Sequence, residues 1–290
     1  MKSSIVCVYG LANAGKSSLI NRILGFKLLP ISEKPQTTRD LVKAIYNDSE
    51  CQLIFVDTPG IFKPHKRFGE ILLRNAESAK YGVDVILYVV DLTKELNYEI
   101  TNKLSNAEQD IVVAFNKIDL VKYEDAKKII DEVKSILPNA EFVEISCKDN
   151  VNIDKVIAIL KSHLKHDYLF FQDDVVLDRP KEYIITEMIR EKCMRLLSKE
   201  LPHAVFIQLD QLNFNEELIE VYATIIVEKE GEKSIVIGKG GKMIKEISRL
   251  SETTIYSYFK VKTICNLVVK VVDNWRSKDK YLKKFGFLND

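Results

Sequence analysis

A short glycine-rich segment near the start of the 290-residue chain has the residue types that bind phosphate groups. It follows the apolar run 5–9, leads through Ser18 into a helical pattern, and reads Gly10-Leu11-Ala12-Asn13-Ala14-Gly15-Lys16-Ser17. This is the phosphate-loop pattern, placed between a strand and a helix as the chemistry requires. Backbone N–H groups of such a loop surround phosphate oxygens, the lysine reaches the β- and γ-phosphates, and the serine hydroxyl can ligate Mg²⁺. The segment therefore predicts a nucleoside triphosphate site.

A carboxylate and a glycine follow the apolar run 53–56, in the segment Asp57-Thr58-Pro59-Gly60, which we assign with Ile61 to the same site. At the carboxyl end of a parallel strand, Asp57 would face the sheet edge that carries the phosphate loop and help to hold the metal. Gly60 can offer its N–H to the γ-phosphate and move when that phosphate leaves. Ile61 stands where Ras-like enzymes carry the glutamine that orients the attacking water. Water must therefore be positioned in another way.

Two later segments are predicted to recognise the base. The first follows the apolar run 111–115 and reads Asn116-Lys117-Ile118-Asp119. The Asp119 carboxylate can accept hydrogen bonds from N1–H and the 2-amino group of guanine, whereas adenine offers neither and would leave a buried carboxylate unpaired. This favours GTP over ATP. The second follows the run 142–145, is placed to close over the base through backbone N–H groups, and reads Ser146-Cys147-Lys148.

A segment between the phosphate loop and Asp57 is a candidate switch, and it reads Pro35-Gln36-Thr37-Thr38-Arg39-Asp40. A switch of this kind needs a hydroxyl that completes the Mg²⁺ shell. We favour Thr38, with Thr37 as the alternative. The predicted catalytic set is then Lys16, Thr38 and Gly60. The predicted metal ligands are Ser17, Thr38 and Asp57.

A second glycine-rich loop lies in the last sixty residues and reads Ile237-Gly238-Lys239-Gly240-Gly241-Lys242. Apolar residues precede it and a helical pattern follows. GXXG loops of KH domains clamp the backbone of four nucleotides, and the two lysines would add positive charge. Residues 231–290 carry 13 Lys and Arg against 6 Asp and Glu, whereas the rest of the chain is net negative. This balance favours RNA binding; a phosphate-binding turn for a small nucleotide is the alternative.

Alternating strands and helices must position the first set of residues. The predicted strands are the apolar runs 5–9, 53–56, 85–90, 111–115 and 142–145. The predicted helices cover 16–24, 67–80, 98–106, 123–136 and 153–164. This alternation predicts an α/β domain with a mainly parallel sheet over residues 1–166, with the ligand beyond the carboxyl ends of its strands.

A polar stretch over residues 167–180 is predicted to be a linker. Residues 181–290 are then predicted to form an α+β domain. Its helices are expected at 183–198 and 243–249 and from 273, and its strands at 203–209, 218–227 and 264–272. Trp275 is expected to anchor the core of this domain rather than to stack on a base.

Composition excludes several other classes of protein. The chain is 46% hydrophobic and 29% charged, close to the globular average. No apolar run approaches the roughly 18 residues that can cross a bilayer, and the N-terminus lacks a secretory leader pattern. Five scattered cysteines without a CxxC, and four histidines without metal spacing, argue against a disulfide framework or a zinc site. We therefore expect a soluble protein of a reducing compartment.

The nucleotide motifs, in this order and with a KH-type loop behind them, resemble those of the Era family, small GTPases of bacterial ribosome assembly. The resemblance covers nearly the whole chain and includes the segments 36–39, 57–66, 200–203, 237–241 and 273–275. It implies a Ras-like P-loop GTPase domain with a mainly parallel sheet, followed by an α+β type II KH domain. Ala12, Ala14 and Cys147 depart from the usual Pro, Val and Ala of the family, but all three are small residues.

The resemblance also implies ligands, partners and a location. It implies GTP or GDP with Mg²⁺, slow intrinsic hydrolysis, and binding of the KH domain to the 3′ end of 16S rRNA and to the 30S particle. It further implies a monomer in the cytoplasm with peripheral attachment to the inner membrane. Asn13 beside an apolar Ile61 is similar to the GTPases that use K⁺ near the phosphates in place of an arginine finger.

Two alternative functions stay open from the sequence. In the first, GTP only stabilises the fold of an RNA chaperone that does not hydrolyse it productively. In the second, the protein is a GTPase that assists tRNA modification. Such enzymes carry a C-terminal catalytic cysteine and lack a KH loop, whereas Cys193 and Cys265 lie within amphipathic or apolar runs.

Overall fold

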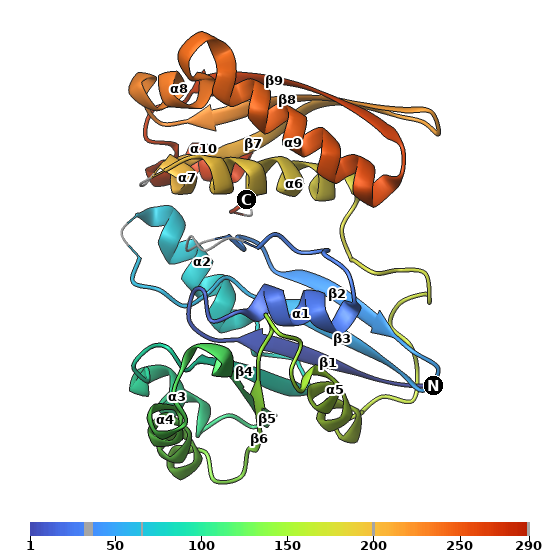
Figure 1. Cartoon of the computed structure of the whole chain (residues 1–290), viewed down its shortest axis with the longest axis vertical. Coiled ribbons are helices and arrows are strands. Elements are labelled where there is room, and N and C mark those ends of the chain that lie inside the picture. The colour runs from blue at the N-terminus through green and yellow to red at the C-terminus, as the bar shows by residue number, and fades with distance from the viewer. Residues whose placement is uncertain (32–36, 65, 199–200, 289–290) are drawn as a thin grey trace. The chain divides into compact units, whose positions relative to one another are not determined.

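The structure is a computed structural model that describes residues 1–31, 37–64, 66–198 and 201–288 (Figure 1). By their contacts, residues 1–31, 38–63 and 72–178 form a first compact unit. Residue 37 and the described residues of 64–71 and 179–288 form a second. Residues 32–36, which include Pro35 and Gln36 of the predicted switch, lie outside the described residues, as do His65 and Glu200 of the segments that carry the family resemblance.

A six-stranded sheet forms the centre of the first unit, in the order β2-β3-β1-β4-β5-β6. Five of these strands run parallel and match the predicted apolar runs: β1 (Lys2–Tyr9), β3 (Cys51–Asp57), β4 (Val85–Asp91), β5 (Asp110–Asn116) and β6 (Glu141–Ile145). Every residue of β3 and β4 is buried, which explains why their sequences are largely apolar on both faces.

The edge strand β2 (Val42–Asn47) has no counterpart among the predicted strands. It pairs antiparallel with β3, so that Val42 lies opposite Asp57. Its sequence mixes polar residues with apolar ones, and Lys43 is exposed. A mixed run of six residues carries too weak a periodic signal to identify an edge strand.

Helices connect the parallel strands and cover both faces of this sheet (Figure 1). The helices α1 (Lys16–Leu24) and α4 (Tyr123–Ile136) have the predicted bounds. The helices α2 (Arg67–Ser78), α3 (Tyr98–Leu104) and α5 (Ile153–Ser162) each end two residues earlier than predicted. Apolar side chains of α3 and α4 join one face of the sheet in a common core, and α1 lies beside α5.

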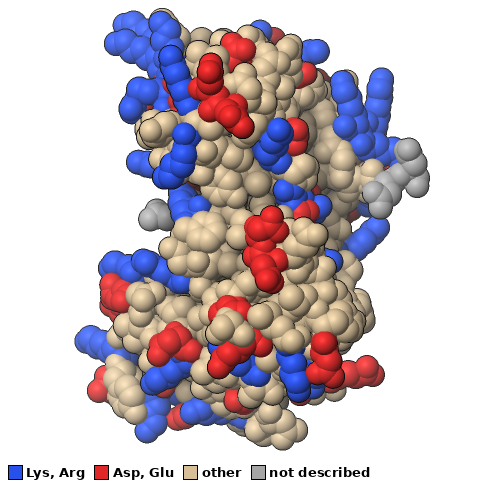
Figure 2. All heavy atoms as spheres, turned by 90° about the vertical axis from the view of Figure 1, so that its right-hand side faces the viewer, with Lys and Arg blue, Asp and Glu red and all other residues tan. Residues whose placement is uncertain are grey.

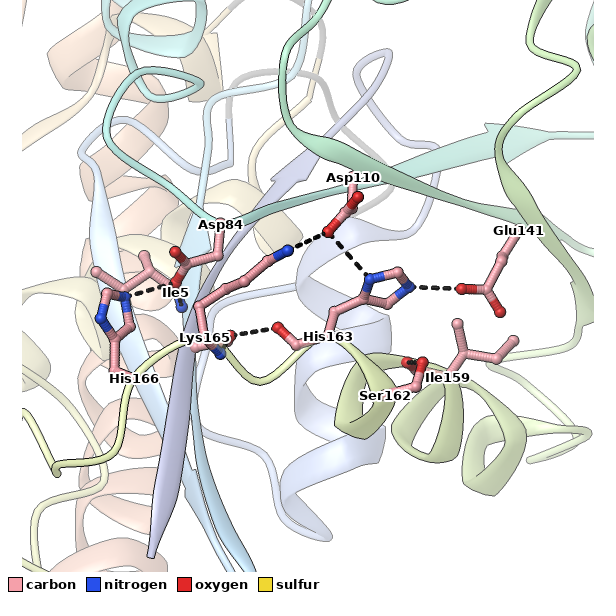
Figure 3. A network of polar contacts seen from close by, with 10 residues as sticks. Ile5, Asp84, Asp110, Glu141, Ile159, Ser162, His163, Lys165 and His166 are labelled. Carbon is pink, nitrogen blue, oxygen red and sulfur yellow. Dashed lines mark hydrogen bonds and ion pairs between the residues drawn. The ribbon is translucent and has the colours of Figure 1, made fainter.

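Ion pairs tie the chain after α5 to the amino ends of the strands (Figure 3). The His163 ring lies between two carboxylates, with Nδ1 3.1 Å from Asp110 Oδ2 and Nε2 2.5 Å from Glu141 Oε1. Lys165 Nζ is 2.7 Å from the same oxygen of Asp110. Because Asp110 begins β5 and Glu141 begins β6, the network fixes the chain at the sheet edge opposite the phosphate loop.

The residues that follow, predicted as a linker from 167, continue along the first unit. His166 Nε2 is 3.1 Å from Asp84 Oδ2 (Figure 3). Backbone bridges join Ser3 to His166 and Ala44 to Leu177. Residues 167–178 therefore belong to the first unit by their contacts, and the second unit resumes at residue 179.

Replacing Asp110 with asparagine should weaken the His163 network in a pH-dependent way. The hydrogen bond from Lys165, together with the nearby His163, holds the pKa of Asp110 below its usual value. A carboxyl group with a lowered pKa stabilises the fold above its unfolded pKa of about 3.9, and this stabilisation is lost as the pH falls through the folded value. The variant should therefore unfold at a lower urea concentration than wild type at neutral pH, and the difference should shrink below about pH 4.

Urea titrations followed by circular dichroism at several pH values measure this difference. Asp131→Asn is a suitable control, because it removes the same charge from an exposed position on α4 of the same unit. A difference for Asp110→Asn that stayed constant from neutral to acid pH would show that the carboxylate does not stabilise the network.

A three-stranded sheet in the order β7-β8-β9 organises the second unit. The strands β7 (Phe206–Phe214) and β8 (Leu218–Val227) are antiparallel, and β9 (Lys262–Val271) runs parallel to β8. Apart from the first turn of α2, the described part of this unit contains five α-helices: α6 (Lys181–Leu196), α7 (Leu201–Ala204), α8 (Glu230–Ile237), α9 (Lys242–Phe259) and α10 (Asp279–Lys284). The α8–α9 pair forms the crossover between the parallel strands β8 and β9, and α9 packs against β9 and α6.

Some predicted bounds in this unit were wrong. The strand predicted at 203–209 begins only at Phe206, because 201–204 form the single turn α7. The helix predicted at 243–249 extends to Phe259, and the one predicted from 273 begins at Asp279 after a 3-10 turn. The apolar residues before the glycine loop form the last turn of α8. A short apolar run does not by itself separate helix from strand.

Trp275 is a core residue, as predicted. Its side chain is fully buried, and its ring lies against the rings of Phe206, Phe285 and Phe287. Its indole N–H donates to the backbone oxygen of Ala204 at 2.8 Å. The aromatic cluster thus joins the end of the chain to the start of β7. Among the described helices of the whole chain, none combines the length and the apolar character needed to span a bilayer.

Candidate functional site

The phosphate loop connects β1 to α1 and surrounds the lysine that begins the helix. Lys16 is 6% exposed, and its ammonium donates to the backbone oxygens of Gly10 and Leu11 at 3.2 and 2.9 Å. Burial lowers the pKa of Lys16 to about 8, although the Asp57 carboxylate opposes this shift. An anionic phosphate at this position would favour the charged form of the buried ammonium.

Gly60 lies directly against the phosphate loop. A Cβ atom at this position would be 2.3 Å from the Cα atom of Ala12, so no other residue fits without movement of the backbone. Ile61, the next residue, forms two hydrogen bonds of 3.1 Å with the same loop. The Ala12 N–H donates to the Ile61 oxygen, and the Ile61 N–H donates to the Gly10 oxygen. The structure therefore places Gly60 and Ile61 beside the predicted phosphate site.

Three oxygen-bearing side chains meet at the carboxyl end of β3. The hydroxyls of Ser17 and Thr38 donate to Asp57 Oδ2 at 2.8 and 3.0 Å, and the two hydroxyl oxygens are 3.1 Å apart. Asp57 Oδ1 is buried and has no hydrogen-bond partner among the described residues. Burial raises the pKa of Asp57, against the opposing effect of Lys16. Hydroxyl and carboxylate oxygens are the ligands that Mg²⁺ prefers, so this set fits that ion.

The structure brings Thr38, rather than Thr37, to this cluster. Thr37 is 9% exposed and belongs to the second unit by its contacts. Thr58, which follows Asp57, donates its hydroxyl hydrogen to the Val8 oxygen at 2.7 Å and so joins the ends of β1 and β3.

Asn116 links the phosphate loop to the predicted base-closing loop. Its Nδ2 donates to the Ala14 oxygen at 2.8 Å, and its Oδ1 accepts the Cys147 N–H at 3.2 Å. Lys117 has a left-handed backbone, and its ammonium is 2.6 Å from Asp91 Oδ2. These contacts bring the ends of β4, β5 and β6 together next to the phosphate loop.

Asp119 has one carboxylate oxygen held by a hydrogen bond and one without a hydrogen-bond partner among the described residues. Oδ1 accepts the Ser146 hydroxyl hydrogen at 2.7 Å. Oδ2 is buried without a hydrogen-bond partner among the described residues, and the Lys148 ammonium lies 3.7 Å from it. A buried carboxylate oxygen left in this way fits a ligand that brings its own N–H donors, as the N1–H and 2-amino groups of guanine do.

The glycine loop of the second unit joins α8 to α9. Ile237 ends α8 and Lys242 begins α9, while Gly238, Gly240 and Gly241 all have positive φ. A Cβ atom on Gly240 would meet nothing within 4 Å, so the outer side of the loop is open. Lys239, within the loop, and Lys242, directly after it, are both exposed.

The last sixty residues, which include this loop, carry a surplus of positive charge. Figure 2 shows lysine and arginine side chains projecting in groups from the second unit, whereas blue and red side chains are intermixed over the first. The loop itself combines an open backbone at Gly240 with the exposed side chains of Lys239 and Lys242, as a phosphate-backbone ligand requires.

Two residues near the base site were missed by the sequence analysis. Asp91, at the carboxyl end of β4, pairs with Lys117, and its place at a strand end was a usable signal. Arg22 of α1 donates to the backbone oxygen of Cys147 at 2.6 Å. No spacing rule could have found that contact, because the two residues are 125 positions apart.

A phosphate loop, an oxygen cluster for Mg²⁺, a guanine-type carboxylate and a GXXG loop together define a GTPase joined to a KH domain. Two family models match accordingly. The model described as a 50S ribosome-binding GTPase matches residues 5–117, and the KH domain model matches residues 200–276.

The chain belongs to the Era family of GTPases. It is 34% identical over 293 residues to GTPase Era of Staphylococcus haemolyticus (strain JCSC1435), and the match covers 100% of this chain and 98% of that protein. It is also similar, at 30% identity and a TM-score of 0.93, to a crystal structure of a variant of Aquifex aeolicus Era bound to GDP and aluminium fluoride. A structure of Era with MgGDPNP and nucleotides 1506–1542 of 16S ribosomal RNA gives the same identity and TM-score. Each match covers all of both chains.

Proposed function

We propose that this protein is a GTP-hydrolysing switch that binds the 3′ end of 16S rRNA through its KH domain and assists assembly of the 30S subunit. The observation that carries the proposal is the buried Asp119 oxygen without a hydrogen-bond partner, in a chain that also has an open GXXG loop. The similar Era structure with MgGDPNP and an rRNA fragment supports the choice of both ligands.

The nucleotide chemistry follows from the positions of the side chains. Ser17, Thr38 and Asp57 would hold Mg²⁺, which supplies positive charge to the β- and γ-phosphate oxygens. The Lys16 ammonium adds charge to the same phosphates, and the Gly60 N–H can donate to the γ-phosphate. Loss of that phosphate removes the acceptor of the Gly60 N–H, so the segment around Gly60 can rearrange.

We also propose that K⁺ assists hydrolysis, with the Asn13 side chain among its ligands. Asn13 lies in the phosphate loop with φ 65°, a conformation that asparagine tolerates. The apolar Ile61 offers no group to orient water or to stabilise charge. If K⁺ supplies the missing stabilisation, hydrolysis should be roughly tenfold or more faster in KCl than in NaCl. Equal rates in the two salts at equal ionic strength would contradict this role, and Asn13→Ala should reduce the difference.

Single-turnover hydrolysis of GTP, with and without purified 30S particles, tests the proposed function. For the switch, we expect slow GTP hydrolysis by the protein alone and a different rate of hydrolysis when 30S particles are added. A protein that binds GTP but produces no phosphate in either condition would instead be the RNA chaperone in which GTP is structural. From the ribosomal RNA partner we infer that the protein acts in the cytoplasm. The monomeric state and the peripheral contact with the membrane stay predictions.

A further inference from the structure

An arginine at the end of α1 holds the backbone of the base-closing loop. Arg22 lies in the last turn of the helix and on its exposed side. Its guanidinium donates two hydrogen bonds to neighbouring carbonyl groups of this loop. Nε is 2.6 Å from the oxygen of Cys147, and Nη2 is 2.9 Å from the oxygen of Lys148. None of the nucleotide motifs includes this residue.

The direction of these carbonyl groups fixes the direction of the neighbouring N–H groups. In a trans peptide, the C=O and the following N–H point in opposite directions, and the described residues contain no cis peptide bond. The Lys148 N–H therefore points away from Arg22. The N–H groups on either side are already used, since Cys147 donates to Asn116 Oδ1 at 3.2 Å and Asp149 donates to Ser146 Oγ at 3.0 Å. Within the described part of the chain, the Lys148 N–H remains available to a ligand atom.

Besides these two N–H groups, other contacts hold the base of this loop. Ser146 and Val151 exchange two backbone hydrogen bonds of 3.3 and 3.0 Å, and the Ser146 hydroxyl donates to Asp119 at 2.7 Å. The carbonyl groups of Cys147 and Lys148, between these points, are held by Arg22. Asp119 would accept a hydrogen bond from N1–H of guanine, and the O6 acceptor lies next to N1 on the same base. An N–H donor on this loop could therefore form a hydrogen bond with O6.

The geometry points to Arg22 as a positioning residue for guanine recognition. It keeps the two carbonyl groups turned outward and thereby keeps the Lys148 N–H turned toward O6 of the base. The planar guanidinium can span two acceptors at once, whereas a lysine ammonium is a point donor on a flexible stem. Helix α1 then serves both ends of the nucleotide, with Lys16 and Ser17 at its start and Arg22 at its end. The inference rests on the guanine site proposed above.

Three variants of the full chain separate the effect of the two guanidinium hydrogen bonds, called the fork below, from the effect of the positive charge. Arg22→Gln removes the fork, Arg22→Lys keeps the charge, and Lys128→Gln removes one charge from an exposed position on α4 of the same unit. Release of a fluorescent GDP analogue is measured by stopped flow. We expect Arg22→Gln to release it about tenfold faster, because two charge-assisted hydrogen bonds are lost at an exposed position. Arg22→Lys should fall between this variant and wild type, and Lys128→Gln should match wild type.

A second nucleotide distinguishes positioning of the loop from general loosening of the fold. In 6-thioguanosine diphosphate, sulfur replaces O6 and is a weak acceptor, while N1–H and the 2-amino group are kept. Because the Lys148 N–H then lacks a good partner, Arg22→Gln should change the release of this nucleotide little. Equal acceleration for both nucleotides, or unchanged GDP release, would overturn the inference. Wild-type protein that bound neither nucleotide would instead refute the proposed guanine site.

Discussion

Replacing Asp119 with asparagine is expected to convert a guanine site into a site that prefers xanthine. Asparagine has the same shape and its amide oxygen can still accept the Ser146 hydroxyl hydrogen, now received by Oδ1 at 2.7 Å. At the other position, the buried carboxylate oxygen is replaced by an NH₂ group. That NH₂ group is a donor, so it cannot accept hydrogen bonds from the N–H donors of guanine. It can, however, donate a hydrogen bond to the 2-oxo group of xanthine.

The expected effect is large because two hydrogen bonds to a charged group are lost in a buried site. Each is worth about 1.5–3 kcal/mol, so GDP affinity should fall by roughly a hundredfold to ten-thousandfold. Xanthosine diphosphate affinity should rise in the same variant. Calorimetric titration of wild type and variant with both nucleotides measures the change.

Asp125→Asn is the matched control for this experiment. It makes the same substitution at an exposed position in the first turn of α4, in the same unit. GDP affinity should stay close to the wild-type value in the control. If Asp119→Asn also kept its preference for guanine, Asp119 could not be the residue that reads the base.

Replacing Gly240 with aspartate should remove RNA binding while leaving the fold in place. A Cβ atom at this position meets nothing within 4 Å, and aspartate tolerates positive φ better than most residues. The new carboxylate would lie where the RNA backbone is expected, next to Lys239 and Lys242. Repulsion between this carboxylate and the phosphates should weaken binding by about tenfold or more, which corresponds to about 1.4 kcal/mol.

The probe is a single-stranded RNA with the sequence of the 3′ end of 16S rRNA, and fluorescence anisotropy measures its affinity. Gly286→Asp is a close control, because Gly286 also has positive φ, at 79°, and also has nothing within 4 Å of an added Cβ. The control should bind RNA nearly as wild type does. Equal losses in the two variants would mean that added negative charge, rather than the glycine loop, explains the result.

The sequence was sufficient where a site is made of consecutive residues. The phosphate loop, the segment around Asp119 and the glycine loop each lie within a few residues of chain, and the buried strands before the first two are apolar enough to recognise. The sequence was insufficient where a contact joins distant segments. The bonds from Arg22 to the base-closing loop depend on how α1 lies beside the end of β6, and no periodic pattern encodes this.

Elements at the margins of the sheets were also difficult to predict. The edge strand β2 mixes polar and apolar residues without a regular alternation, so its composition resembles that of a loop. The apolar residues 235–237 could equally have ended a strand, but in the structure they end α8, which packs against α9 and β9. In both cases tertiary contacts, rather than local propensity, decide the structure.

The central claim is that the guanine nucleotide governs RNA binding by the KH domain. The most direct test is the affinity of the wild-type protein for the 16S rRNA 3′-end probe, measured at saturating GDP and at saturating GDPNP with Mg²⁺. Because the similar Era complex holds RNA together with MgGDPNP, we expect tighter binding with GDPNP, by about tenfold or more, which requires about 1.4 kcal/mol of coupling. Equal affinity in the two nucleotide states would contradict the claim and leave two independent binding sites in one chain.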